Sequence, residues 1–378
     1  MCDEIFGENN FVNIIVWKKT NSPKSQSNAL GSQHEYVLFY AKDLSQLRIN
    51  KFAGAIDEKY KASFAHDDGD GRGQYQTVAL VAGGTQRSAK RKSFEFHGVT
   101  DQWLYKKETL EQWWQDNRIY KTNGGKYRLK KYLSETEGRL LSDIWIDDEI
   151  KALQGGSSEY MGFVTQKPLS LIKRICKLFH NKALILDFFA GSGTTGEAII
   201  ESNKDDDGRR KFILCTNNED NNGDGKKIAE DICYPRIKKV IQGFIDNKSK
   251  KIEGFEGNLK YFKTDFVDAN PTDRNKKKLV DKSTEMLCLK EDCFDEVKKG
   301  HEFKVFKNSQ DKHLGIIYDD EGIDEFKKEA KRLKKKFVVY VFSLDESARE
   351  EEFEDIADLV ELKPIPAVIL NVYKRIFK

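Results

Sequence analysis

Residues 187–196 read Asp-Phe-Phe-Ala-Gly-Ser-Gly-Thr-Thr-Gly, and this stretch decides the fold. The apolar run before it, residues 183–187, is typical of a buried strand, and an amphipathic pattern after it predicts a helix to about residue 202. A second apolar run follows at residues 211–216. Two strands joined by one helix form a βαβ unit, which indicates a parallel sheet in an α/β fold.

The glycines of this stretch predict a ligand-binding turn. Gly191 and Gly193 let the backbone turn tightly, and a ligand there would meet the N-terminus of the helix. The spacing also fits the G-x-G-x-x-G of dinucleotide sites. However, Asp187 at the strand end would repel a pyrophosphate, and no ribose-binding acid is well placed about 20 residues later. An NAD-dependent oxidoreductase and a plain turn without ligand are the alternatives, whereas a P-loop is excluded because no Gly-Lys-Ser/Thr follows.

Length and composition favour a soluble protein of two or three domains. The chain has 378 residues, of which 34% are charged and 38% hydrophobic, with a net charge of +3. No apolar run approaches the roughly 18 residues of a membrane span, and the N-terminus lacks the features of a secretory signal. The six cysteines form no Cys-x-x-Cys pair and the histidines lack metal-ligand spacing, so we assign no metal site and expect reduced thiols in the cytoplasm.

Four segments differ in sequence pattern. Residues 1–45 contain two strand-like runs, 11–17 and 35–40, whereas residues 46–160 are irregular, basic and aromatic. In that second segment we expect short strands, loops and one helix near 106–117, with tryptophans 103, 113, 114 and 145 mostly as core or interface anchors. Residues 161–265 hold the βαβ unit, preceded by a helix that Pro168 starts. Residues 266–378 predict a small α/β domain with a charged linker at 270–278, a lysine-rich helix at 323–336, and strands at 314–318, 337–342 and 366–373.

Several ordered motifs together resemble one enzyme family. The glycine stretch resembles the S-adenosylmethionine motif of the permuted (β-class) adenine-specific DNA methyltransferases, above all the modification (Mod) subunits of type III restriction systems. The likeness runs in register from about residue 1 to 265 and is carried by further segments: Asp3-Glu-Ile-Phe-Gly-Glu8, Ile15-Val-Trp-Lys-Lys19, Gln33-His-Glu-Tyr36, Asp143-Ile-Trp145, Thr165-Gln-Lys-Pro168, Asn217-Asn-Glu219 and Tyr234-Pro-Arg-Ile-Lys-Lys239.

The resemblance implies a fold and a cofactor. The fold is a partial doubly wound, Rossmann-like methyltransferase sheet with an inserted target-recognition domain and a small C-terminal α/β domain. The cofactor is S-adenosyl-L-methionine, with Asp187 on the methionine amino group and Lys167 and Thr194 near its carboxylate. The cofactor-binding residues implied are Lys167, Asp187, Phe188, Phe189, Ala190, Gly191, Ser192, Gly193, Thr194 and Thr195.

The catalytic loop of the family, Asp-Pro-Pro-Tyr, is missing from this sequence. That loop holds the flipped adenine by hydrogen bonds to its amino group and by stacking. The chain has six prolines, no two of which are adjacent, so we assign no catalytic residue. We therefore expect the chain to be inactive alone. Three explanations stay open: the chain pairs with a separately encoded N-terminal half, it is a truncated remnant, or its start codon is misassigned. Without the neighbouring strand of that half, strand 183–187 would have an unpaired apolar edge.

Basic clusters in residues 46–160 predict contacts with double-stranded DNA, since lysines and arginines position phosphates. The candidates are Arg87, Lys90, Arg91 and Lys92, together with a second cluster at residues 121–131. The resemblance adds Lys18 and Lys19 of residues 1–45. A solvated surface explains such runs equally well when they are taken alone, and a DNA-recognition subunit without methyl transfer is a further alternative. The other partners implied are a restriction subunit and a second copy of the chain, with no membrane.

Overall fold

The computed structural model describes residues 1–23, 30–51, 56–84, 93–138, 140–146, 150, 152–153, 157, 159–220, 223–245, 251–268, 270, 272–342 and 350–377. The chain divides into two compact units, Met1–Tyr261 and Phe262–Lys378, and each is considered by itself. Among the described residues, none of the helices combines the length and the apolar character that crossing a membrane requires. The architecture is mixed α/β with several sheets, as the sequence predicts.

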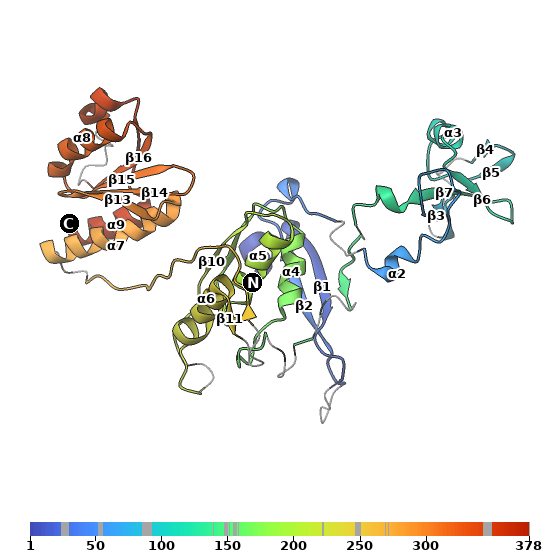
Figure 1. Cartoon of the computed structure of the whole chain (residues 1–378), viewed down its shortest axis with the longest axis horizontal. Coiled ribbons are helices and arrows are strands. Elements are labelled where there is room, and N and C mark those ends of the chain that lie inside the picture. Colours follow the sequence, from blue (N-terminus) through green and yellow to red (C-terminus); the bar gives the residue numbers. More distant parts are fainter. Residues whose placement is uncertain are drawn as a thin grey trace. The chain divides into compact units, whose positions relative to one another are not determined.

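A three-stranded sheet forms one part of the first unit. Its order is β2-β1-β8, with β1 antiparallel to β2 and parallel to β8. Ile15 and Trp17 of β1 point to one face, where they pack with Trp145 and with Leu171 of helix α4. Alternating apolar residues therefore anchor the sheet on a single helix (Figure 1). The bounds are Phe11–Lys18 for β1, His34–Tyr40 for β2, Ile144–Trp145 for β8 and Leu169–Lys177 for α4.

The predicted βαβ unit is confirmed. Strand β9, Leu184–Asp187, lies parallel to β10, Lys211–Leu214, and helix α5, Thr194–Asp205, connects them. Ile200 of α5 packs on Phe212 and Leu214 of β10, because alternate residues of that strand face the helix. After a π-helical turn at Ile228–Cys233, helix α6, Tyr234–Gln242, packs on α5, and a small hairpin of β11, Phe244–Ile245, and β12, Lys251–Ile252, follows.

The opposite faces of both sheets carry exposed apolar side chains. Leu184 of β9 is 64% exposed, and Leu186 on the same face is also exposed. In the other sheet, Ile14 of β1 pairs with Leu38 of β2, and both are exposed. Within the described part of the chain, β9 pairs only with β10 and β2 only with β1. Each sheet thus has one face packed on helices and one face with exposed apolar side chains. In the described part of the chain, no strand lies beyond the outermost strands, β2 and β8 in one sheet and β9 and β10 in the other.

Residues 56–138 form short strands around one helix, as predicted from their irregular sequence. Strands β3, β7 and β6 make an antiparallel sheet, β4 and β5 make a hairpin, and α3 packs beside them with Leu110 in the core. A further short helix, α2, was not predicted. The bounds are Glu58–Lys61 for α2, Tyr75–Ala79 for β3, Phe94–Phe96 for β4, Val99–Asp101 for β5, Lys107–Gln115 for α3, Ile119–Lys121 for β6 and Tyr127–Tyr132 for β7.

The second unit is a five-stranded sheet of order β13-β14-β15-β16-β17, with α7 and α9 packed in one core and α8 in the other (Figure 1). The predicted strands 314–318 and 337–342 and the lysine-rich helix are confirmed as β15, β16 and α8. The bounds are Asp273–Glu291 for α7, Asp295–Lys299 for β13, Phe303–Lys307 for β14, His313–Ile317 for β15, Ile323–Leu333 for α8, Phe337–Val341 for β16, Val360–Lys363 for β17 and Ala367–Phe377 for α9.

Two predictions for this unit are wrong. Residues 366–373 form not a strand but the start of helix α9, because Pro366 supplies the carbonyl that accepts the first helical bonds, from Ile369 and Leu370. The charged stretch 270–278 is not all linker, since Thr272 caps a helix that begins at Asp273. Lysines on an exposed helix face gave this stretch the composition of a loop.

Candidate cofactor site and recognition segment

The glycine stretch forms a tight loop between β9 and α5. Gly191 and Gly193 both have positive φ, 50° and 78°. A Cβ on Gly193 would lie 3.0 Å from the sulfur of Cys233, and one on Gly191 would lie 2.8 Å from the ring of Phe163. Burial raises the pKa of the Cys233 thiol to about 11, so this wall is neutral. Glycine is therefore required at both positions by backbone conformation and by space.

Asp187 organises the loop from the end of β9. One carboxylate oxygen accepts the backbone N–H of Phe189 at 3.0 Å, and the other accepts the hydroxyl of Thr195 at 2.6 Å. A carboxylate offers about four acceptor positions, so Asp187 can still bind a cationic group. Beside it, Phe189 is 92% exposed, and the N-terminus of α5 brings its backbone N–H groups to the loop. The loop thus offers a carboxylate for an ammonium group and helix N–H groups for an anion.

A buried arginine lies beneath the loop, and sequence reasoning did not identify it as a site residue. Arg236 of α6 is 3% exposed, and its Nη1 donates to Thr194 Oγ1 at 2.9 Å and to Ser192 Oγ at 3.2 Å. Its Nε donates to Glu197 of α5 at 2.5 Å. The Arg236 guanidinium therefore connects α6 with Glu197 of α5 and with the hydroxyls of Ser192 and Thr194. The Tyr-Pro-Arg motif of residues 234–236 contained the residue but gave no sign of its partner.

Lys167, predicted at the cofactor, meets the loop through its backbone. Its carbonyl accepts the Thr194 hydroxyl at 3.4 Å, whereas its ammonium group binds Glu35 of β2 at 2.6 Å. Lys19, a predicted DNA contact, binds the same carboxylate. Partial burial acts to raise the pKa of Glu35, but the hydrogen bonds and charges of the two lysines outweigh it, so this pKa lies below its usual value. The structure thus brings Lys167 and Lys19 together on Glu35.

The other predicted residues fall in three groups. Ala190, Ser192, Thr194 and Thr195 are buried in the loop, whereas Phe188 is exposed with Phe189. Lys18 is half-buried at the end of β1. The remaining candidates lie outside the described residues: Arg87, Lys90, Arg91 and Lys92.

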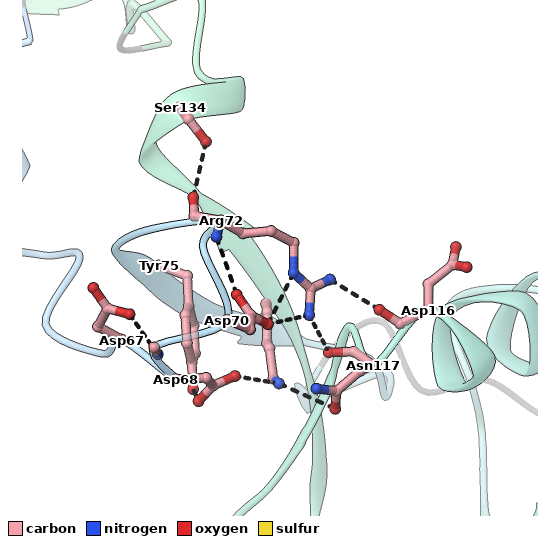
Figure 2. A network of polar contacts seen from close by, with 10 residues as sticks. Asp67, Asp68, Asp70, Arg72, Tyr75, Asp116, Asn117 and Ser134 are labelled. Atoms are coloured by element: carbon pink, nitrogen blue, oxygen red, sulfur yellow. Dashed lines mark hydrogen bonds and ion pairs between the residues drawn. The ribbon is translucent and has the colours of Figure 1, made fainter.

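A polar network fixes one loop of residues 56–138 (Figure 2). The Arg72 guanidinium pairs with Asp70 and donates to the backbone carbonyls of Asp116 and Asn117, at the end of α3. Its own carbonyl accepts the hydroxyl of Ser134. Hydrogen bonding to Arg72 lowers the pKa of Asp70, so the pair stays charged. Arg72 joins three separate pieces of this segment and is a structural residue.

The basic cluster at residues 121–131 contains both buried and exposed charges. Lys130 is buried and binds Asp68 at 2.5 Å, and Arg128 donates to the hydroxyl and carbonyl of Thr77. Lys121 and Lys126, on either side of the β6–β7 turn, are exposed. Only part of the predicted cluster is therefore oriented toward solvent, where a phosphate can reach it.

Residues 1–222 match the family model described as DNA methylase, of the N6/N4 methyltransferases. The chain is 33% identical over 260 residues to the Mod subunit of the type III restriction-modification enzyme StyLTI of Salmonella typhimurium, a match that covers 64% of this chain and 39% of that protein. It is 29% identical over 301 residues to the type II methyltransferase M.KpnI of Klebsiella pneumoniae, covering 67% and 68%. The EcoPI Mod subunit of Escherichia phage P1 is 25% identical over 295 residues, covering 66% and 44%. The chain spans about two fifths of the length of these Mod subunits. With more than half of its residues matched, the chain belongs to the DNA methylase family.

Proposed function

We propose that this chain is the cofactor-binding and target-recognition part of an S-adenosylmethionine-dependent adenine-N6 DNA methyltransferase of a restriction-modification system. The observation that carries the proposal is the loop 187–196. Gly191 and Gly193, both with positive φ, lie between the Asp187 carboxylate at the end of β9 and the N-terminus of α5. Those groups match the ammonium and carboxylate of an amino acid moiety. The cofactor, when bound, supplies the methyl group.

The residues of the chain bind and orient this cofactor. Asp187 would hold the amino group, while Thr194 and the first N–H groups of α5 would hold the carboxylate. Arg236 keeps the Ser192 and Thr194 hydroxyls in place from below. Backbone groups from Phe188 to Gly193 line the site. No residue of the chain is assigned to the adenine amino group, so methyl transfer requires a further segment with the Asp-Pro-Pro-aromatic motif.

Calorimetric titration of S-adenosylmethionine into the purified chain tests the cofactor site. Asp187→Asn keeps an oxygen for the Phe189 N–H but removes the charge, whereas Thr195→Val removes only the hydroxyl bonded to the other oxygen. We expect wild type to bind, Asp187→Asn to lose binding and Thr195→Val to bind more weakly. Equal affinity of wild type and Asp187→Asn would refute the role of the carboxylate. A folded wild type that binds no cofactor would refute an autonomous site and favour a remnant.

The unpaired edge of β9 and the exposed apolar sheet faces support the proposal that a complementing N-terminal half binds this chain. A strand beside β9 would cover its free edge, and helices that follow such strands would cover Leu184 and Leu186. Co-expression with an N-terminal methyltransferase segment that carries the missing motif should give a stable complex with adenine-methylating activity. Leu186→Lys, placed on the exposed face, should leave the isolated chain folded and prevent complex formation. A complex that forms equally well with Leu186→Lys would exclude this face as the contact.

The remaining partners follow from the same proposal. Double-stranded DNA is the substrate, a restriction subunit and a second copy of the chain are protein partners, and the compartment is the cytoplasm. Size-exclusion chromatography with light scattering, with and without duplex DNA, measures the oligomeric state. A DNA-recognition subunit without methyl transfer is the second candidate. It is favoured if the complemented chain binds DNA and cofactor but leaves adenine unmethylated.

A further inference from the structure

Residues 46–160 contain four tryptophans, which we expect to be mostly core or interface anchors, and one of them is exposed. Trp103 and Trp145 are buried, whereas Trp114, near the end of α3, is 38% exposed. A single exposed aromatic residue is common in soluble proteins and needs no special explanation. What distinguishes Trp114 is the way its neighbours hold it.

His97 stacks on Trp114 in a nearly parallel arrangement. The ring centroids lie 4.0 Å apart and the ring planes differ by 11°. Glu111, one turn before Trp114 on the same helix, bonds the Nε2 of His97 at 3.1 Å and fixes the plane of the imidazole. Both side chains of the stack are partly exposed. The rings of His97, from the β4–β5 turn, and Trp114, from α3, thus form one stack at the surface, which we call the Trp114–His97 plate.

The backbone at His97 does not favour histidine. His97 and Gly98 are the two central residues of the β4–β5 hairpin, with φ of 44° and 81°. Two-residue hairpin turns with positive φ at both positions prefer Asn-Gly. Asparagine would therefore serve the turn as well or better, so the turn does not explain the histidine. The imidazole ring, through its stack and its bond to Glu111, is what this position provides.

Two buried aromatic residues pack against Trp114. Its ring is nearly perpendicular to that of Phe96, with centroids 5.9 Å apart and an angle of 88°, and to that of Tyr127, at 5.4 Å and 77°. The Tyr127 hydroxyl donates to the carbonyl of His97 at 3.0 Å, which ties the hairpin to β7. Lys121 lies with its ammonium 5.8 Å from the Tyr127 ring. The plate is therefore held rigidly and has an exposed cation nearby.

We propose that the Trp114–His97 plate stacks on the face of an unpaired nucleobase of DNA. The inference rests on the proposed function and deepens it. Chemistry on a base in duplex DNA requires that base to leave the stack, which exposes flat aromatic faces. Aromatic side chains bind such faces irrespective of sequence. The Glu111 carboxylate beside the plate disfavours a phosphate and leaves an uncharged base as the matching group.

The test compares two fluorescein-labelled 30-base-pair DNA duplexes that are identical except that one carries a single bulged adenine. Fluorescence anisotropy at one fixed salt concentration gives the affinity of the full chain for each duplex. His97→Asn removes the imidazole ring while retaining a residue suited to the turn, and Trp114→Leu removes the indole ring. Tyr105→Leu is the matched control, since Tyr105 is 40% exposed and meets Trp113 rather than the plate.

We expect wild type and Tyr105→Leu to prefer the bulged duplex, and Trp114→Leu to lose about 5- to 150-fold of that preference, the range for one stacked base. His97→Asn should lose part of it. The slope of log affinity against log salt should stay unchanged in both variants, because no phosphate contact is removed.

Two outcomes overturn the inference alone while the chain still binds DNA. Either both plate variants retain the preference for the bulged duplex, or Tyr105→Leu loses as much as they do. A wild type that is folded and binds neither duplex would overturn the proposed function together with this inference. Circular dichroism of each variant shows that a loss of binding is not a loss of folding.

Discussion

Replacement of Arg236 by methionine should destabilise the unit Met1–Tyr261 by about 3–5 kcal/mol, the cost of removing one partner of a buried ion pair. Methionine keeps an unbranched apolar stem but is shorter and has no donor. The Glu197 carboxylate, whose side chain is 16% exposed, would lose its Nε partner, and the Ser192 and Thr194 hydroxyls would lose a charged donor. These losses share one guanidinium and do not add independently, so the estimate is not raised further.

Two further variants separate charge from geometry. Arg236→Lys keeps a cation for Glu197 but has no planar fork to reach the loop at the same time, so its stability should lie between those of wild type and Arg236→Met. In the double variant Arg236→Met/Glu197→Gln, no unpaired charge is left. We expect the double variant to be more stable than Arg236→Met, within about 2 kcal/mol of wild type.

Urea unfolding followed by tryptophan fluorescence is the assay, because all five tryptophans lie between residues 17 and 145 and report on the first unit. Calorimetry with S-adenosylmethionine under native conditions should show weaker binding by Arg236→Met, since the loop hydroxyls lose their support. The reasoning is wrong if Arg236→Met unfolds within about 1 kcal/mol of wild type, or if adding Glu197→Gln makes it less stable.

Three other changes test further parts of the structure. Gly193→Ala should lower the stability of the first unit by at least the ~1–2 kcal/mol of a left-handed residue and weaken cofactor binding, measured by urea unfolding and calorimetry. Burial acts to raise the pKa of Glu291, but hydrogen bonds from Lys312 and from the Tyr340 hydroxyl lower this pKa below the usual 4.5. The ionised Glu291 should therefore stabilise the second unit above pH 4.5, and this stabilisation should be lost as the pH falls further. Glu291→Gln should remove this pH dependence, measured by acid unfolding followed by hydrogen exchange of residues 262–377. Lys130→Met should cost about 1–3 kcal/mol in thermal melts and leave the salt dependence of DNA binding unchanged.

The local pattern around the glycine loop could be predicted because few alternatives exist there. An apolar strand, two glycines and an amphipathic helix specify a βαβ unit almost by themselves. By contrast, the Ala-Val-Ile-Leu of residues 367–370 fits a strand and a helix equally, and the first helical bonds to the Pro366 carbonyl together with the packing of α9 on α7 favour the helix. Short apolar runs carry no period that distinguishes the two.

Side-chain partners were harder to predict than elements. Lys130 and Lys121 look alike in the sequence, yet Lys130 is buried on Asp68 in the middle strand of the sheet, whereas Lys121 is exposed at the end of the outer strand β6. Arg236 has its partners 39 to 44 residues earlier in the chain, and no local rule connects such positions. Charge runs therefore predict a basic surface only in part, since some of the charges hold the fold together.

The bond between Lys167 and Glu35 joins parts of the first unit that the sequence separates by 132 residues. Glu35 is the second residue of β2, and Lys167 lies just before α4 and accepts the Thr194 hydroxyl with its backbone carbonyl. A movement of the β1–β2 sheet would therefore reach Lys167, Thr194 and the start of α5 directly. The free edges of β2 and β9 belong to the two sheets joined by this link. A partner segment that fills those edges would consequently set the spacing of the two sheets and the position of the loop together. Under the proposed function, such a partner should raise the affinity for S-adenosylmethionine, measured by calorimetry of the complex and of the chain alone.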